Sequence, residues 1–150
     1  MSTTSPSGER ERQFAEFLKA FEAEFAPLDA ELALATWETN IRHSPEHEAT
    51  SARLETHLKT ILSRKEAYTT LSQLREGGPL ADPLLDRQLV LLHHAHRGQQ
   101  LSASMIERQV QLAKSLESRF NQFRAQLDGR SVSDNELVDV LRNSTDNAER

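Results

Sequence analysis

The sequence predicts an all-α protein, and its composition and its hydrophobic periodicity are the observations that predict it. Only 5 Gly and 5 Pro occur among 150 residues, and aromatic residues make up 5% of the chain. Residues that favour helices, such as Ala, Leu, Glu and Arg, are frequent, whereas the β-branched residues that favour strands are scarce. Apolar residues recur in steps of three and four, which is the spacing of one helical face. At this length the chain can bury a core without metal or disulfide bonds.

The first helix is expected to run from Glu9 to about Ile41. Its apolar residues fall on one face: Phe14, Phe17, Leu18, Phe21, Phe25, Leu28, Leu32 and Ala35. Pro27 lies inside this stretch and cannot donate a backbone hydrogen bond, so we expect a kink or a short break there. Leu34, Trp37 and Ile41 form a second apolar edge, which predicts that the segment after Pro27 is covered on two sides.

A second long helix is expected to follow a short turn. Ser44 is a residue type that caps helices, and Pro45 suits the first helical position. The helix is expected to continue to residue 76, because Gly77-Gly78-Pro79 supplies a left-handed cap and then a residue that cannot continue a helix. Two long helices joined by a short turn lie antiparallel, so residues 9–76 are predicted to form a long helical hairpin.

Two more helices are expected after a loop that ends at residue 83. The third helix is the most apolar segment of the chain, and Gly98 ends it. The fourth helix is expected to start at Ser102 or Ser104, both of which are capping residue types. Its apolar stripe continues to Leu127, and Gly129 is expected to close it.

A short fifth helix is predicted by the capping box of Ser133 and Glu136, whose side chains can satisfy each other's backbone N–H groups. The last residues, 144–150, begin like a further helix, which indicates either a chain cut off in the first turn of that helix or a frayed tail, so whether the natural protein continues past Arg150 stays open. The chain is accordingly divided into a disordered tail at 1–8, the hairpin at 9–76 and a helical subdomain at 77–150.

Composition excludes several classes of function. The net charge is −5 with acids and bases interspersed, which provides no basic surface for nucleic acid. The absence of Cys removes disulfide bonds and thiolate metal sites. The longest apolar run, Leu89–Leu92, is far shorter than the roughly 20 residues that a membrane span requires. Because the N-terminus also lacks a signal-peptide pattern, we expect a cytoplasmic protein that binds neither nucleic acid nor a membrane.

The nearest approach to a catalytic motif is His47-Glu48-Ala49-Thr50-Ser51. The zinc motif H-E-x-x-H needs two His four positions apart on a helix, with the Glu between them as general base. Ser51 stands where the second His is required, so one zinc ligand is missing. Neither a phosphate-binding Gly-rich loop nor a G-x-S-x-G turn occurs. The glutamates are expected on solvated helix faces: Glu16, Glu22, Glu24, Glu31, Glu38, Glu46, Glu48, Glu55 and Glu66. We therefore predict no catalytic, cofactor-binding or metal-binding residue.

Three histidines, His93, His94 and His96, look more like a ligand cluster, because neutral imidazoles bind zinc, nickel or copper. They also lie at the end of an apolar helix, where hydrogen-bonding or cationic side chains complement free carbonyl groups. That position favours a structural or solvated role, and whether they bind a metal stays open. His43 and His47 are spaced by four, but the second helix begins between them and they do not share a face.

Two segments carry a resemblance to a known family. The stretch Leu34-Ala35-Thr36-Trp37-Glu38-Thr39-Asn40-Ile41 resembles the first-helix segment of the angiotensin-converting-enzyme-like peptidyl-dipeptidases. Asn135-Glu136-Leu137 and the later Asn143-Ser144-x-Asp146-x-x-Glu149-Arg150 resemble a stretch that leads into a Trp-containing helix in these zinc peptidases. The resemblance covers about Phe14 to Arg150, and the thimet-like oligopeptidases are broader relatives.

The resemblance implies that this chain is the non-catalytic N-terminal part of a larger helical zinc peptidase. The helices of about Phe14–Glu76 would form a lid over a deep cleft that admits peptides. The family's zinc helix, carboxylate ligand and substrate-binding residues lie downstream of the matched region, so none is carried over to this sequence. The chain alone is expected to be inactive, with zinc present only in a full-length relative. Its partners would be the rest of the peptidase and the peptide substrate.

The main alternative is a free-standing helical bundle that acts as a protein–protein interaction module. In that case the helices bury their apolar stripes against each other or against a partner. A metal-binding bundle that uses His93, His94 and His96 is a third hypothesis.

Overall fold

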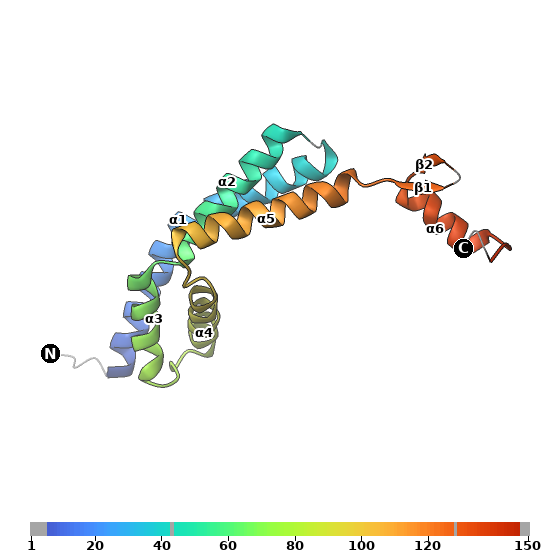
Figure 1. Cartoon of the computed structure of the whole chain (residues 1–150). Helices are drawn as coiled ribbons and strands as arrows, with labels where there is room; N and C mark the ends of the chain where they lie inside the picture. The colour runs from blue at the N-terminus through green and yellow to red at the C-terminus, as the bar shows by residue number, and fades with distance from the viewer. Residues whose placement is uncertain (1–5, 43, 128, 148–150) are drawn as a thin grey trace. The chain divides into compact units, whose positions relative to one another are not determined.

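The computed structural model describes residues 6–42, 44–127 and 129–147. Over these ranges the protein is all-α, with six helices and one short two-stranded hairpin (Figure 1). The chain divides into two compact units, Met1–Lys114 and Ser115–Arg150, which are described separately below. Of the predicted tail at 1–8, residues 1–5 lie outside the described residues, and residues 6–8 belong to the first helix, so the prediction of disorder is wrong for these three. Within the described ranges, no helix has both the length and the apolar composition that crossing a membrane requires.

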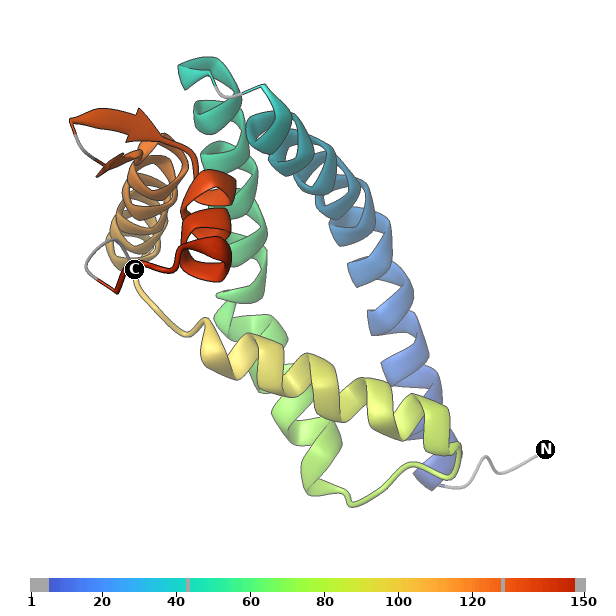
Figure 2. The same cartoon turned by 90° about the vertical axis from the view of Figure 1, so that its right-hand side faces the viewer.

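The longest helix is α1 (Pro6–Ile41), and it passes through Pro27 without interruption (Figure 2). The sequence predicted a kink or a short break at this position, and the short break is wrong, because α1 is continuous. Proline removes the hydrogen bond to the carbonyl of Ala23, four residues earlier. Both residues are exposed, so water can satisfy that carbonyl and the helix tolerates the loss.

The region predicted as one second helix contains two, α2 (Pro45–Leu62) and α3 (Lys65–Glu76). The predicted start is confirmed, because the Ser44 hydroxyl accepts a hydrogen bond from the N–H of His47 at 3.2 Å. The predicted continuity is wrong. The hydroxyl of Ser63 donates to the carbonyl of Thr60 at 2.9 Å, and Arg64 adopts an extended conformation. Side chains that bond to nearby backbone groups compete with the helical hydrogen-bond pattern, which gives a local reason for the break.

Helix α4 (Pro83–Gly98) has the boundaries that the sequence predicted. Gly78 has a φ of +84°, so the expected left-handed residue follows the end of α3. The side chain of Asp82 caps α4 by accepting from the N–H groups of Leu84 and Leu85, at 2.7 and 3.3 Å. Helices α3 and α4 pack against each other and against the N-terminal half of α1, and the three enclose the main core.

Two neighbouring residues of α1 hold the loop between α3 and α4. The guanidinium of Arg10 donates to the carbonyl of Leu74 at 2.8 Å and also to those of Gly77 and Gly78. The carboxylate of Glu11 accepts from the two N–H groups of residues 81 and 82, at 2.6 and 2.9 Å. A cation thus meets the carbonyl end of α3, and an anion meets the N–H groups before α4, as helix dipoles favour.

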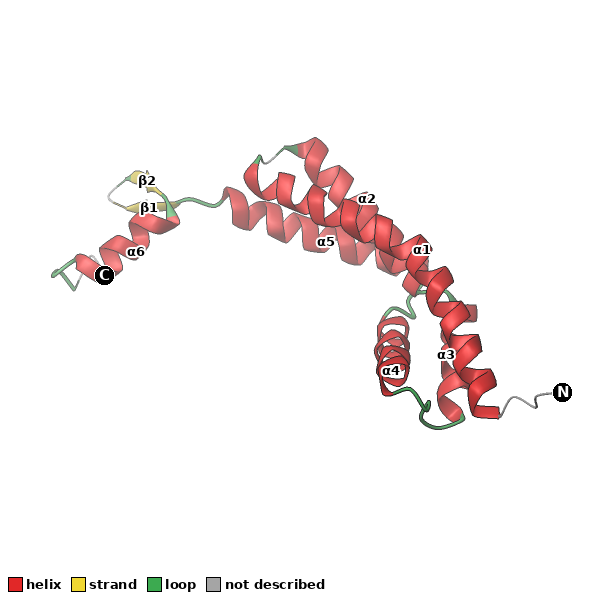
Figure 3. Ribbon diagram, turned by 180° about the vertical axis from the view of Figure 1, so that it is seen from behind, coloured by secondary structure: helices red, strands yellow, loops and turns green. Residues whose placement is uncertain are grey.

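The core lies among α1, α3 and α4. Its buried members come from all three helices and the intervening loop: Phe14, Leu71, Leu74, Leu80 and Leu89. A second buried group lies on α2 and on the start of α5 (Ala103–Gln122): Ser51, Leu54, Leu58, Ile61, Ile106 and Val110. Helix α5 begins as expected, because the Ser102 hydroxyl accepts from the N–H of Met105 at 3.3 Å. Within the first unit it runs beside α2 (Figure 3).

The second unit contains the end of α5, the strands β1 (Ala125–Leu127) and β2 (Arg130–Val132), and α6 (Asp134–Asn143). The sequence predicted helix as far as Leu127, and the structure contradicts this. The strands pair antiparallel, with Leu127 opposite Arg130, and Gly129 in the turn has a φ of +75°. Asp-Gly is a dipeptide that two-residue hairpin turns favour, so the sequence contained a signal for this hairpin.

Helix α6 confirms the predicted capping box. The Ser133 hydroxyl accepts from the N–H of Glu136 at 3.3 Å, and the Glu136 carboxylate accepts from the N–H of Ser133 at 2.7 Å. These bonds, together with the guanidinium of Arg130 at 2.9 Å, lower the pKa of Glu136 to about 2. A carboxylate that accepts several hydrogen bonds stays charged. The further helix expected at 144–150 lies partly outside the described residues, which end at 147.

Candidate functional site

The partial zinc motif lies at the start of α2. His47 lies in the first turn of α2, where its Nδ1 is 2.7 Å from the carbonyl oxygen of Arg42. Ser51 is buried one turn later. Among the described residues, no three His, Cys, Asp or Glu side chains are arranged to hold a metal ion. His43 lies outside the described residues, so its predicted separation from His47 stays a prediction.

The three histidines of α4 do not share one environment. Nδ1 of His93 lies 3.0 Å from an Arg75 guanidinium nitrogen, and its Nε2 lies 3.2 Å from the Ser72 hydroxyl. The ring of His94 is beside that of His93 but is exposed. His96 is 0% exposed, and it packs among aromatic rings of α1. The rings therefore face different neighbours.

An exposed apolar stripe of the first unit lies on the last turns of α1. Leu34, Trp37 and Ile41 are spaced by three and four residues and so share one helix face. Their exposed fractions are 62%, 63% and 56%. The sequence predicted that this edge would be covered, but the first unit leaves it exposed. Large apolar side chains that gather on a surface indicate an interaction site.

A groove of about 280 Å³ lies beside this stripe, between α1 and α2. Leu34 and Ala35 from α1 and Leu54 from α2 provide its apolar lining. Glu31 and Glu38 of α1 stand one turn on either side of Leu34 and line the same groove, and α2 adds polar side chains: His47, Thr50 and Arg53. The groove and the stripe share Leu34, and together we call them the α1–α2 docking surface.

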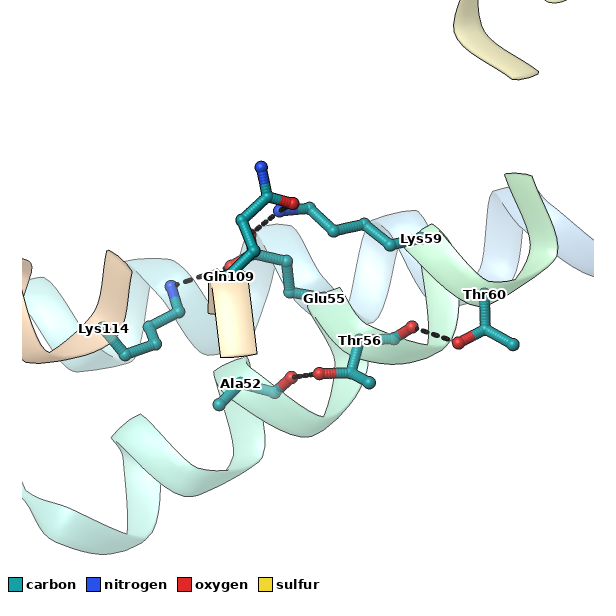
Figure 4. Close-up of polar contacts among 7 residues, drawn as sticks. All are labelled: Ala52, Glu55, Thr56, Lys59, Thr60, Gln109 and Lys114. Atoms are coloured by element: carbon teal, nitrogen blue, oxygen red, sulfur yellow. Dashed lines mark hydrogen bonds and ion pairs between the residues drawn. The ribbon is translucent and has the colours of Figure 1, made fainter. Parts of the chain in front are cut away.

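A polar cluster ties α5 to α2 (Figure 4). The carboxylate of Glu55 lies 3.0 Å from the ammonium of Lys59 on its own helix and 3.2 Å from that of Lys114 on α5. Lys59 also donates to the side-chain oxygen of Gln109 at 3.2 Å. The order of these contacts shows that α5 runs antiparallel to α2. The cluster joins two helices, so we interpret it as structural.

The electrostatics of Glu55 follow from this cluster. Burial of the carboxylate would by itself raise its pKa, but the hydrogen bonds and charges of Lys59 and Lys114 outweigh burial. The pKa of Glu55 is therefore held below its ordinary value. The expectation that the glutamates lie on solvated faces does not hold for Glu55, whose side chain is only 22% exposed.

A second, smaller pocket of about 150 Å³ opens where α2 breaks before α3. Phe17, Phe21 and His96 line it, and so do Glu24 and Arg64. Arg64 and Glu24 form a two-pronged ion pair with both N–O distances at 2.6 Å. We call this space the His96 pocket.

The sequence did not predict that these residues come together in one pocket. Arg64 and Glu24 are 40 positions apart in the chain, and His96 comes from a third segment. The polar cluster on α2 did have a local sequence signal, because Glu55 and Lys59 have the spacing at which side chains of one helix pair. The pocket itself has no such local signal.

No protein-family model, curated protein or solved structure matches this chain. The resemblance to angiotensin-converting-enzyme-like peptidases therefore stays a prediction.

Proposed function

We propose that the first unit is a protein–protein interaction module that binds a basic amphipathic helix on the α1–α2 docking surface. The observation that carries this proposal is Trp37, which stands 63% exposed at the centre of an apolar stripe. Tryptophan is the residue type most enriched among the side chains that dominate binding energy at interfaces. A groove beside an apolar stripe matches the way in which amphipathic helices are bound.

The acidic residues of α1 favour a basic partner. Between residues 20 and 41, α1 contains five acidic residues and no Lys or Arg: Glu22, Glu24, Asp29, Glu31 and Glu38. Glu31 and Glu38 stand at the edges of the groove, where they can pair with lysines that flank the apolar face of a bound helix. Arg53 of α2 lines the same groove and provides one opposing charge.

The single tryptophan of the chain supplies a direct test. We expect a synthetic helical peptide of Leu and Lys to shift the emission of Trp37 to shorter wavelength, because binding removes the indole from water. The shift should saturate with peptide concentration and weaken as salt is added. A peptide in which every Lys is replaced by Glu should bind much less.

Variants locate the site. Leu34→Ser and Ile41→Ser should each weaken binding about tenfold, whereas Leu91→Ser, at another exposed leucine on α4, should leave it unchanged. Equal binding of the Lys and Glu peptides would contradict the charge argument. If no peptide changes the emission spectrum of Trp37, the proposal that the α1–α2 docking surface binds a helix is wrong.

The second candidate is the one that the sequence resemblance implies, the lid region of a zinc-dependent oligopeptidase or peptidyl-dipeptidase. The antiparallel packing of α1 on α2 is compatible with it, and the rest of such a peptidase would cover the Leu34–Ile41 stripe. In this reading zinc and the catalytic Glu belong to the missing part, and the chain alone hydrolyses no peptide.

The coding sequence separates the two candidates. A reading frame that continues past Arg150 into an H-E-x-x-H helix would support the peptidase candidate. A stop codon directly after Arg150 would count against it and favour the module. Zinc measured in the purified chain after dialysis tests both candidates together. Neither candidate expects the chain to retain zinc stoichiometrically, so such retention would contradict both.

A further inference from the structure

Helix α5 carries an exposed apolar stripe of its own. Leu112, Leu116 and Phe120 follow one another in steps of four residues and so lie along one side of the helix. Their exposed fractions are 49%, 64% and 75%. Met105, seven positions before Leu112, is exposed on the same side, and we call these four residues the α5 stripe. Large apolar side chains gathered in this way indicate that something packs on them.

The charges beside the α5 stripe are positive. Arg108 and Arg119 stand four positions before and seven positions after Leu112, which places both of them next to it. Both are exposed, and neither guanidinium pairs with a carboxylate within the part of the chain that the structure describes. Glu107 and Glu117 each stand five positions from Leu112, about 140° around the helix, and so lie on the other side. The stripe is therefore flanked by cations.

The α5 stripe faces away from α2 of its own chain. Ile106 and Val110 of α5 are buried, and the ammonium of Lys114 lies 3.2 Å from the carboxylate of Glu55 on α2 (Figure 4). Lys114 follows Leu112 by two positions, which is about 200° around the helix. The side that holds α5 on α2 is thus opposite the stripe. While α5 is held there, its stripe cannot enter the groove between α1 and α2 of the same molecule.

The α1–α2 docking surface matches the α5 stripe in polarity and in charge. It presents Leu34, Trp37 and Ile41 as exposed apolar side chains, and Glu31 and Glu38 line the groove beside them. Neither of these carboxylates pairs with a cation among the described residues. Helix α5 thus has the properties that the proposed function requires of a partner, a basic amphipathic helix.

We propose that the partner on the α1–α2 docking surface is the α5 stripe of a second copy of this chain, an inference that rests on the proposed function. Each copy carries both surfaces, so two copies can exchange α5 helices and form the same contact twice about a two-fold axis. Charge favours this pairing over the symmetric ones. Two α5 stripes would bring arginines together, and two α1 stripes would bring glutamates together.

Sedimentation velocity of the full chain tests the proposal. The wild-type chain should form a dimer as its concentration rises, and added salt should weaken the dimer because it screens the charges. The emission of Trp37 should shift to shorter wavelength over the same range of concentration, since the second copy covers the indole. A wild-type chain that stays monomeric up to its solubility limit would overturn the proposal.

Two charge-reversed chains identify the surfaces. One carries Glu31→Arg with Glu38→Arg, and the other carries Arg108→Glu with Arg119→Glu. Each alone should dimerise at least about tenfold more weakly than wild type, because like charges meet at both contacts. An equimolar mixture should dimerise about as well as wild type, because opposite charges then meet at both contacts. If the mixture dimerises no better than either chain alone, the proposal is wrong.

An apolar variant gives a second test that does not depend on charge. Leu116→Ser removes an exposed apolar side chain of the α5 stripe and should weaken the dimer about tenfold. Arg87→Glu, at an exposed position of α4, is the control and should leave dimerisation unchanged. Circular dichroism verifies that each variant is folded. A dimer that Leu116→Ser does not weaken would contradict the proposed contact.

The peptide of Leu and Lys separates this inference from the proposed function. If the chain stays monomeric and the peptide still shifts the emission of Trp37, the docking surface binds a helix and only the identity of its partner is wrong. If neither the peptide nor a second copy changes that emission, both proposals are wrong.

Discussion

At the scale of single residues, the contacts of Arg10 and Glu11 fix how α1 meets the loop between α3 and α4. Arg10 supplies donors to three carbonyl groups at the end of α3, and Glu11 accepts from two N–H groups before α4. Charged groups form the stronger hydrogen bonds, and backbone groups at helix ends otherwise lack partners within the helix. These two side chains therefore contribute more than ordinary surface charges.

We expect Arg10→Ala to lower the free energy of unfolding by about 2 kcal/mol, because three carbonyl groups lose a charged donor. Arg12→Ala is the matched control, since Arg12 is exposed and pairs with Glu9 on its own helix. The Arg12→Ala variant should lower the free energy of unfolding by less than about 0.5 kcal/mol. Urea denaturation followed by circular dichroism measures both values. If both variants lower the free energy of unfolding equally, the contacts of Arg10 with the carbonyl groups add no more stability than an exposed ion pair.

Glu55 is expected to make stability depend on pH. Its folded-state pKa lies below the ordinary value of 4.5, so its contribution is fully present above about pH 4.5 and is lost as pH falls through the folded-state pKa. Glu55→Gln should therefore lower the free energy of unfolding by about 1 kcal/mol at pH 7. This difference from wild type should become smaller below pH 4.5. Urea denaturation at pH 7 and pH 3 tests this. Glu22→Gln, at an exposed position of α1, should show little difference at either pH.

Residue-scale features were predictable from the sequence where the interaction was local. The caps at Ser44 and Ser133 bond to N–H groups three residues later, and both were predicted. The partners of Arg10 and Arg64 are 64 and 40 positions away, so no window of sequence indicates them. The His96 pocket depends on such distant pairs, which is why it could not be predicted.

At the scale of elements, the sequence predicted where most helices begin but misplaced two ends. The apolar stripe of the second helix continues past Ser63, so periodicity gave no sign of the break before Arg64. The stripe of α5 likewise continues to Leu127, although the chain leaves the helix at Gln122 and forms β1. Periodicity records which side chains are apolar, and it does not identify competing turn conformations.

Two glycines provide a prediction at this scale. Gly129 has a φ of +75° in the turn between β1 and β2, where a side chain is strained, so Gly129→Ala should destabilise the hairpin by about 1–2 kcal/mol. Gly98 ends α4 with open space around its Cα. Gly98→Ala should leave stability unchanged or raise it by up to about 1 kcal/mol. NMR contacts between β1 and β2 measure the stability of the hairpin, and thermal unfolding measures the effect of Gly98→Ala. If the hairpin contacts are as strong in Gly129→Ala as in wild type, the expected destabilisation of the hairpin is wrong.

At the scale of the whole molecule, the chain forms two compact units, and the main core belongs to the first. We expect a chain of residues 1–122 to keep its helical circular dichroism signal and its cooperative thermal unfolding, because every member of that core lies between Phe14 and Leu89. The full chain serves as the reference for the unfolding midpoint. A fragment that unfolds without cooperativity would show that the first unit depends on residues 123–150.

The fold class was predicted correctly from composition and periodicity, which are properties of the whole chain. The candidate docking surface was predicted in part. The sequence identified Leu34, Trp37 and Ile41 as an apolar edge and predicted that something covers it. What covers it could not be predicted, because an apolar stripe has the same sequence whether its partner lies within the same chain or outside it.

The contacts of Arg10 and Glu11 have a consequence for the order in which the protein is made. Arg10 and Glu11 are synthesised before their partners at residues 74–82, which follow 64 to 71 positions later in the chain. During that interval α1 has neither the loop nor α4 to pack on, and its phenylalanine-rich face stays open to water and to chaperones. The N-terminal end of α1 thus has to wait for the synthesis of the next 64 to 71 residues before it can acquire these native partners.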